Sequence, residues 1–314
     1  MSVITSYRIA ELVLSVEQQR RDGVAPGALP PAYAPFATVA PVGEADVTLQ
    51  AVSEPPEQPR PDPGSPRCET TQWIAYRSED RPVFLFKSVL PGLPIWRSAV
   101  REQGAARWRV STAPEFRSLT GVEREPAALA FPLGELVFLD ALTERGGLVF
   151  HSCGIRDGSE GRGPDGQPGQ RRGMIFTGHS GRGKSTIGAL WTAQGATLLC
   201  DDRIAVRPTP EGHQLCGTPW HGDLRQVSPE TGPLHALFFL EHAEQTRIER
   251  ISPEDAQRRM LTTVWQPVWT GQAGLGALWE RCARLAREVP MFRLRFRPEP
   301  ATIDRLRGVM AELA

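Results

Sequence analysis

Residues 173–202 read GMIFTGHSGRGKSTIGALWTAQGATLLCDD, and this stretch decides how the second half of the chain folds. Gly178, Gly183, Lys184 and Ser185 fit the phosphate-binding loop pattern G-x-x-x-x-G-K-[ST]. A short apolar run before the loop predicts a buried strand, and apolar residues spaced i, i+3, i+4 after it predict an amphipathic helix. A second apolar run then ends in two aspartates. The order is strand, glycine loop, helix, strand and acidic pair, which is the context that a phosphate loop requires.

Each position of this loop has a physical role. Glycine lets the backbone turn tightly and brings its N–H groups close to phosphate oxygens. Lys184 would reach the β- and γ-phosphates, the Ser185 hydroxyl would complete the coordination of Mg²⁺, and the start of the helix would add a positive dipole. We therefore predict ATP and Mg²⁺ as cofactors, held by the loop residues Gly178, His179, Ser180, Gly181, Arg182, Gly183, Lys184, Ser185 and Thr186.

The lysine in the pattern is informative because the chain has only two lysines, Lys87 and Lys184. Every other basic residue is arginine, so arginine would be expected at this position if the two were interchangeable. A compact ammonium suits a phosphate loop, whereas a forked guanidinium does not. In a chain of this composition, the pattern arises by chance roughly 0.002 times. The alternative is a glycine-rich turn between strand and helix that binds no ligand.

Two further features could carry chemistry. Asp201 and Asp202 end the strand after the loop helix, where an acidic residue commonly holds the Mg²⁺ of a nucleotide. Neighbouring side chains at a strand end point to opposite faces, so one carboxylate could bind the metal while the other takes a proton from a hydroxyl. The sequence does not show which aspartate has which role. It also leaves open that the pair is only a solvated strand end or a turn cap. His151, in a predicted strand at 148–153, is either a packed core residue or a catalytic one.

Composition excludes several classes of protein. The chain has 314 residues with 36 basic and 36 acidic side chains, so no net charge points to nucleic acid or to an anionic membrane surface. Its five cysteines lack C-x-x-C spacing, which favours reduced thiols over a disulfide framework or a zinc site. No signal peptide and no apolar run of about eighteen residues is present. We expect a cytoplasmic protein that is not embedded in a membrane.

The chain is predicted to have two parts. Residues 1–125 should form a β-rich region, in which the proline-dense segment 25–66 is irregular and superficial apart from a short strand near 47–49. Residues 126–314 should form the domain that contains the phosphate loop. The segment 157–172, which is rich in glycine and charged residues, should be a mobile hairpin connection. Further predicted elements are helices at 133–142, 275–289 and 301–313, a helix capped by Ser252, and strands at 234–240 and 292–296.

Three segments together resemble the catalytic domain of the HPr serine kinase/phosphorylases and their shorter relatives: LVFHSCGI at 148–155, IFTGHSGRGKST at 175–186 and ATLLCDDRIAV at 196–206. The resemblance covers roughly residues 130–300. It implies an α/β P-loop domain of the type shared with phosphoenolpyruvate carboxykinases. It also implies that His151 lies near the active site, that one of Asp201 and Asp202 is a general base toward a serine hydroxyl, and that their neighbourhood binds Mg²⁺. HPr kinases are hexamers, so the resemblance admits a homo-oligomer.

The chain also departs from that family. The glycine-rich signature that follows the acidic pair in bifunctional HPr kinases is absent, and the first 125 residues do not resemble their regulatory domain. These differences argue against HPr as substrate and against the phosphorylase reaction. The predicted catalytic residues are Asp201, Asp202, His151 and Lys184, with Ser185, Asp201 and Asp202 at the metal. They would transfer the γ-phosphoryl group of ATP to a hydroxyl of a protein, a peptide or a small molecule.

Two alternatives come from other classes. The chain could be an accessory protein that binds nucleotide and engages a partner without phosphotransfer. It could also be an enzyme similar to ATP-dependent phosphoenolpyruvate carboxykinase, although those enzymes are much longer and need metal and oxaloacetate ligands that this sequence does not display.

Overall fold

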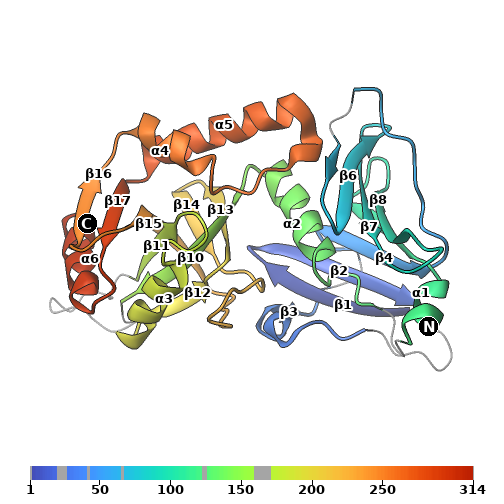
Figure 1. Cartoon of the computed structure of the whole chain (residues 1–314), viewed down its shortest axis with the longest axis horizontal. Coiled ribbons are helices and arrows are strands. Elements are labelled where there is room, and N and C mark those ends of the chain that lie inside the picture. The colour runs from blue at the N-terminus through green and yellow to red at the C-terminus, as the bar shows by residue number, and fades with distance from the viewer. Residues whose placement is uncertain are drawn as a thin grey trace. The chain divides into compact units, whose positions relative to one another are not determined.

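A computed structural model describes residues 2–19, 27–40, 43–64, 67–121, 126–158 and 171–313. The chain is mixed α/β and forms two compact units. Unit 1 consists of Met1–Ala141 and Gln266–Gly276, and unit 2 of Leu142–Trp265 and Ala277–Ala314 (Figure 1). Among the described residues, no helix has the length and the apolar character needed to span a membrane.

Unit 1 is built on a nine-stranded mixed sheet with the strand order β3-β1-β2-β4-β9-β8-β7-β6-β5. Most neighbours are antiparallel, but β4 runs parallel to both β2 and β9. The strands are β1 (Ser2–Ile9), β2 (Leu12–Gln19), β3 (Ala37–Thr38), β4 (Val47–Ser53), β5 (Cys68–Glu69), β6 (Trp73–Ser78), β7 (Arg81–Lys87), β8 (Ile95–Arg101) and β9 (Arg107–Thr112). The helices are η1 (Pro31–Phe36), α1 (Glu115–Thr120), α2 (Leu133–Glu144), whose last residues belong to unit 2, and η2 (Val268–Thr270).

The strand β4 corrects one sequence-based prediction. A short strand near 47–49 was expected within an irregular surface segment, but β4 lies in the middle of the sheet of unit 1. Val47 is 2% exposed and Leu49 is fully buried. Prolines flank the strand on both sides, so proline density correctly excludes a long helix in this segment but does not exclude a central strand.

The boundary between the units also differs from the predicted division at 125/126, because Asp140 ties three separate segments together. Its Oδ1 accepts a hydrogen bond from Trp269 Nε1 (2.9 Å), and its Oδ2 accepts one from Arg101 Nη1 (3.2 Å). The Trp269 ring packs edge-on against Phe84, with 5.0 Å between centroids. A buried carboxylate needs such partners. They join most of α2 and the segment around η2 to the sheet of unit 1.

Unit 2 contains the phosphate-loop segment. Its strands are β10 (Leu148–Asp157), β11 (Arg172–Thr177), β12 (Thr197–Cys200), β13 (Arg203–Thr209), β14 (Gly212–Cys216), β15 (Thr231–His242), β16 (Arg247–Arg250) and β17 (Met291–Phe296). Its helices are α3 (Lys184–Ala193), α4 (Pro253–Met260), α5 (Gly271–Glu288), which begins in unit 1, and α6 (Ala301–Glu312). The predicted elements of this half are therefore present, with shifts of a few residues at their ends.

The strand pairings of unit 2 close a ring. β10 pairs with β13, β13 with β14, β14 with β15, β15 with β11, and β11 again with β10. Beyond this ring, β15 continues in parallel to β17, and β12 pairs with the distal part of β10. β11, which carries the loop at its carboxyl end, therefore has a neighbouring strand on each side.

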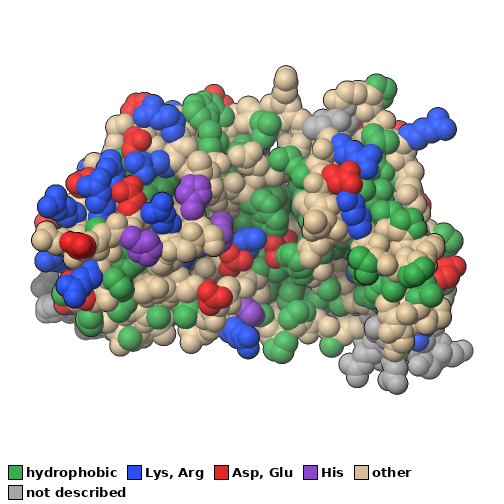
Figure 2. All heavy atoms as spheres, viewed as in Figure 1, with side chains coloured by type: hydrophobic (Ala, Val, Ile, Leu, Met, Phe, Trp, Pro, Cys, Tyr) green, Lys and Arg blue, Asp and Glu red, His purple; other side chains and the backbone are tan. Residues whose placement is uncertain are grey.

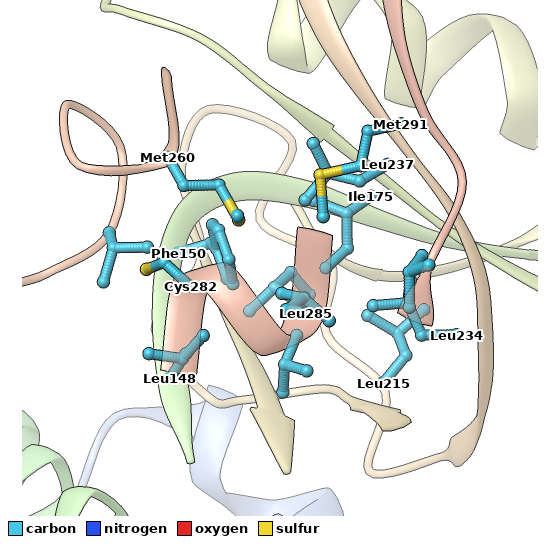
Figure 3. Close-up of a cluster of buried hydrophobic side chains, with 14 of the residues drawn as sticks. Leu148, Phe150, Ile175, Leu215, Leu234, Leu237, Met260, Cys282, Leu285 and Met291 are labelled. Atoms are coloured by element: carbon cyan, nitrogen blue, oxygen red, sulfur yellow. The ribbon is translucent and has the colours of Figure 1, made fainter. Parts of the chain in front are cut away.

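Successive residues of the inner strands of unit 2 enter two different cores. Ile175 of β11 and Leu237 of β15 belong to one cluster, whereas Phe176 and Phe238 belong to the other. Helices α4 and α5 contribute to the first core, and α3 and α6 to the second. This two-sided burial explains why these strands read as continuous apolar runs in the sequence. Figure 3 shows side chains of the first core gathered around the α5 residue Leu285.

Local sequence signals agree with the ends of several helices. Ser252 caps α4, because its hydroxyl accepts a hydrogen bond from Asp255 N (3.3 Å), and Pro253 is the first helical residue. Gly195 follows the last turn of α3 with a φ of +84°, a conformation that glycine adopts readily at the end of a helix. The ends of β10 and β11 pair as a hairpin requires, at Asp157 and Arg172, while residues 159–170 of the predicted mobile connection lie outside the described part of the chain.

Truncating Leu285 to alanine should lower the free energy of unfolding by about 2–5 kcal/mol, because its side chain is fully buried between α5 and the sheet. Leu275→Ala in the same helix is the control: that side chain is 39% exposed, so we expect a loss of about 1 kcal/mol. Urea unfolding followed by tryptophan fluorescence measures both. Equal losses would contradict the burial assigned to the two positions.

Candidate functional site

The loop between β11 and α3 has the backbone conformation that its glycines allow. Gly181 and Gly183 have φ values of +77° and +91°, which other residues rarely adopt. A Cβ atom on Gly183 would also lie 2.8 Å from the Phe296 ring. The residues from His179 to Arg182 are exposed. The loop is thus a tight, solvent-facing turn with its glycines where only glycine fits.

Lys184 is the first residue of α3 and folds back over the start of the loop. Only 8% of the residue is exposed. Its Nζ donates to the carbonyl oxygens of Gly178 (3.0 Å) and His179 (3.3 Å). Burial lowers the pKa of this ammonium, an effect that the nearby charge of Asp202 opposes. A desolvated cation whose acceptors among the described residues are two neutral carbonyls can gain much from an approaching anion.

The first main-chain hydrogen bond of α3 runs from Ile187 N to Gly183 O, at 2.9 Å. The N–H groups of the preceding helical residues have no partner within a helix. They lie at the positive end of the helix dipole, beside the Lys184 ammonium. Ser185 and Thr186 belong to this first turn, and Thr186 faces solvent. The donor set therefore fits a phosphate chain.

Asp201, which follows β12 directly, is bound within the protein. It is 2% exposed. Its Oδ2 accepts hydrogen bonds from Ser185 Oγ (3.1 Å) and Leu224 N (3.0 Å), and its Oδ1 accepts one from Gly222 N (2.7 Å). This carboxylate connects the phosphate loop, the end of β12 and the loop at 217–223.

Asp202 points to a different set of partners. Its Oδ1 lies 2.9 Å from His151 Nε2 and 2.8 Å from Arg203 Nη1. Burial alone would raise the pKa of this carboxyl, but the hydrogen bond from His151 and the charges of Arg203, His151 and Lys184 outweigh it and lower the pKa. Its side chain keeps 29% exposure, so Asp202 is an ionised carboxylate that solvent can reach.

The structure therefore brings the predicted residues together and separates the two aspartates. Asp201 faces Ser185, and Asp202 faces His151, as the alternation of side chains at a strand end predicts. Lys184 is close enough to both carboxylates for their charges to act on its pKa. Among the described residues, no group of three or more His, Cys, Asp or Glu side chains could hold a metal ion alone. Mg²⁺ usually needs only one or two carboxylates together with phosphate oxygens, so the set present here fits it.

Some residues at the site were not predicted. Arg203, read as part of a strand, pairs with Asp202, and its guanidinium lies 4.6 Å from the centre of the Trp265 ring. His242 Nε2 lies 2.6 Å from the carbonyl oxygen of Gly181. Around His221 and Asp223, it is the main-chain N–H groups of Gly222 and Leu224 that contact Asp201. In the sequence, only its position next to the acidic pair marks Arg203 as a candidate site residue, and nothing marks His242.

A cavity of about 550 Å³ lies beside the loop in unit 2. Gly178, His179 and Arg182 line it on the loop side, the end of β15 contributes residues 239–242, and α4 and the residues after it contribute the rest. Its wall meets the candidate site at Thr263, whose carbonyl oxygen accepts a hydrogen bond from His151 N (2.8 Å).

No protein-family model matches the chain, and a search of curated proteins found no match.

The lowered pKa of Asp202 predicts how its contribution to stability depends on pH. A carboxyl whose pKa falls on folding stabilises the folded state above its ordinary value of 3.8, and this contribution is lost as the pH falls through the folded-state value below it. The difference in free energy of unfolding between the wild type and Asp202→Asn should thus be present near pH 6 and shrink below about pH 3.8. Urea unfolding at several pH values measures it.

The exposed loop residue Asp223, changed to asparagine, is the control for this titration. A wild-type advantage over Asp202→Asn that stays constant down to about pH 3 would contradict the ionic role of Asp202.

Proposed function

We propose that the chain is a P-loop kinase of the HPr-kinase-like type, which transfers the γ-phosphoryl group of ATP to a hydroxyl of a protein, a peptide or a small molecule. One observation carries this proposal. Beside the buried Lys184 ammonium stand two adjacent carboxylates, one hydrogen-bonded to the loop residue Ser185 and the other to His151. A loop that only bound nucleotide would need the first carboxylate but not the second.

The loop and Lys184 account for nucleotide binding. The N–H groups at the start of α3 would donate to phosphate oxygens, and Lys184 would exchange its two carbonyl contacts for oxygens of the β- and γ-phosphates. Ser185 and Asp201 would hold Mg²⁺, the hydroxyl as a direct ligand and the carboxylate as the group that orients it. When bound, Mg²⁺ neutralises charge on the phosphates.

Asp202 is the proposed general base. It is ionised, it is partly exposed, and His151 and Arg203 both hold its Oδ1. It would accept the proton of the acceptor hydroxyl while that oxygen bonds to the γ-phosphorus. The bond from the γ-phosphorus to the bridging oxygen breaks, and ADP leaves. Lys184 and the loop amides would stabilise the charge that develops, which is the main protein contribution in phosphoryl transfer.

Mg-ATP should stabilise the wild-type protein against unfolding, by about 2.7 kcal/mol at a hundred times its Kd. Lys184→Ala should abolish this stabilisation because it removes the buried cation of the loop. Lys87→Ala is a matched control, because Lys87 is the only other lysine and pairs with Glu69 on the sheet of unit 1. Thermal unfolding with and without Mg-ATP measures all three proteins. Equal stabilisation of wild type and Lys184→Ala would refute the nucleotide site.

The two aspartates should separate binding from transfer. Asp202→Asn should keep Mg-ATP binding and lower phosphoryl transfer by about 10²–10⁴, the usual contribution of a general base. Asp201→Asn should instead weaken the dependence of ATP binding on Mg²⁺, because it removes an acceptor for Ser185. Transfer of labelled phosphate to serine peptides and to water is the readout. If wild type binds Mg-ATP but transfers nothing, and Asp202→Asn behaves identically, an accessory nucleotide-binding protein is the better description.

A further inference from the structure

We infer that the cavity beside the phosphate loop binds the acceptor, and that this acceptor is an alcohol with a carboxylate near its reacting hydroxyl, on a peptide or on a small hydroxy acid. This inference rests on the proposed kinase function and extends it to the class of substrate. It follows from where the cavity lies, from how its charges are paired, and from its size.

The position of the cavity places it at the end of the loop where the terminal phosphate would lie. Lys184 Nζ contacts the carbonyl oxygens of Gly178 and His179, and both of these residues line the cavity. In phosphate loops this lysine reaches the β- and γ-phosphates. On the other side, the cavity wall at Thr263 is hydrogen-bonded to the main chain of His151, the partner of Asp202. An acceptor in this cavity would thus lie beside the γ-phosphate, at a wall that is hydrogen-bonded to the strand of His151.

The acidic side chains of the cavity are already paired. Arg259 donates to Asp255 Oδ2 (2.8 Å) and to Glu241 Oε1 (3.2 Å), and Arg295 donates to Glu241 Oε2 (3.2 Å). The pKa of Glu241 is lowered despite its burial, because the hydrogen bonds from Arg295 and Arg259 outweigh that burial. These carboxylates therefore stay ionised and neutralise Arg259, so they form a fixed part of the wall.

Two arginines of the cavity remain available for a ligand. Arg258 on α4 approaches Asp255 only to 3.7 Å, and its side chain is 69% exposed. Arg182, at the exposed turn of the phosphate loop, forms no ion pair with any residue that the structure describes. Guanidinium groups match the geometry of a carboxylate and can bind it through two hydrogen bonds. An anionic acceptor would give Arg182 a partner and Arg258 a closer one than Asp255.

The remaining features of the cavity suit a small polar ligand. Its volume of about 550 Å³ is within the range of pockets that enclose small molecules or a short peptide segment. Phe239 and Leu240 are also among the residues that line it, and the ring of Phe239 lies 5.9 Å from the Arg259 guanidinium. Figure 2 shows basic and acidic side chains interspersed over the part of unit 2 where α4, β16 and β17 lie.

The test measures peptide binding directly. The full chain is saturated with Mg²⁺ and β,γ-imido-ATP, so that the phosphate loop is occupied and cannot itself bind the carboxylates of the probe peptide. The probe is a fluorescein-labelled, amidated peptide Gly-Glu-Ser-Glu-Gly, and the neutral isostere Gly-Gln-Ser-Gln-Gly is its control. Fluorescence anisotropy should show the acidic peptide binding at least about tenfold more tightly. Competition by L-glycerate, but not by glycerol, would show that a small hydroxy acid is an equally good source of the carboxylate.

Arg258→Glu should weaken binding of the acidic peptide by about five- to tenfold and leave binding of the neutral peptide unchanged, because it replaces attraction by repulsion at a partly exposed position. Arg247→Glu is the matched control, since Arg247 is an exposed arginine of β16 that does not line the cavity. Arg258→Gln, which removes the charge without reversing it, should give an intermediate loss.

Equal binding of the two peptides, no binding of either peptide or of glycerate, or equal effects of Arg258→Glu and Arg247→Glu would each overturn the inference. Failure of the kinase proposal would be recognised separately, as a wild-type protein that Mg-ATP does not stabilise or that transfers no phosphate. Discrimination between acidic and neutral peptides by Arg258 is a binding measurement and does not require phosphate transfer.

Discussion

The buried carboxylate of Asp201 is the interaction on which the candidate site depends. Three donors from two distant segments converge on it, the Ser185 hydroxyl and the main-chain N–H groups of Gly222 and Leu224. A carboxylate that is 2% exposed would be strongly destabilising without these hydrogen bonds. Because every one of them is made, the start of α3, the end of β12 and the loop at 217–223 are held in a fixed relation.

This arrangement explains Gly222 in that loop. A Cβ atom on Gly222 would lie 2.9 Å from Asp201 Oδ2, so no larger residue fits while the hydrogen bond from its N–H is kept. The neighbouring Asp202 is held quite differently, by His151 and Arg203, and retains contact with solvent. Two identical side chains at consecutive positions thus acquire different properties from their surroundings, a recurrent way of dividing structural and chemical roles.

Much of unit 2 could be predicted from the sequence, because its signals are local. The loop pattern, the apolar spacing of α3, the cap at Ser252 and the apolar run of β15 each predict an element that the structure contains. The sequence left open whether His151 is a core or a catalytic residue, and its pairing with Asp202 was not predicted, since strand order alone does not fix which side chains meet. The ring of strand pairings and the cavity at α4 were not predictable, because they join residues far apart in the chain and have no local pattern.

In unit 1, even less of the structure could be predicted from local sequence signals. The strand β4 stands in a proline-rich context that suggested a superficial segment, and only its parallel neighbours β2 and β9 show that it is central. The contact between Asp140 and Trp269 joins positions 129 residues apart, so nothing near either residue could have indicated it. Periodicity reports which face of an element is buried, whereas it does not report which element covers that face.

The contribution of Trp269 to unit 1 has a consequence for the order in which the protein can form during synthesis. Chains emerge from the ribosome amino end first, and a unit that is contiguous in sequence can fold while the rest is still being made. Unit 1 is not contiguous, because Gln266–Gly276 belongs to it and is made only after Leu142–Trp265 of unit 2. Until Trp269 emerges, Asp140 lacks the hydrogen bond from Trp269 Nε1 and Phe84 lacks a packing partner. The amino-terminal unit therefore completes its core late, when most of the carboxyl-terminal unit has already left the ribosome.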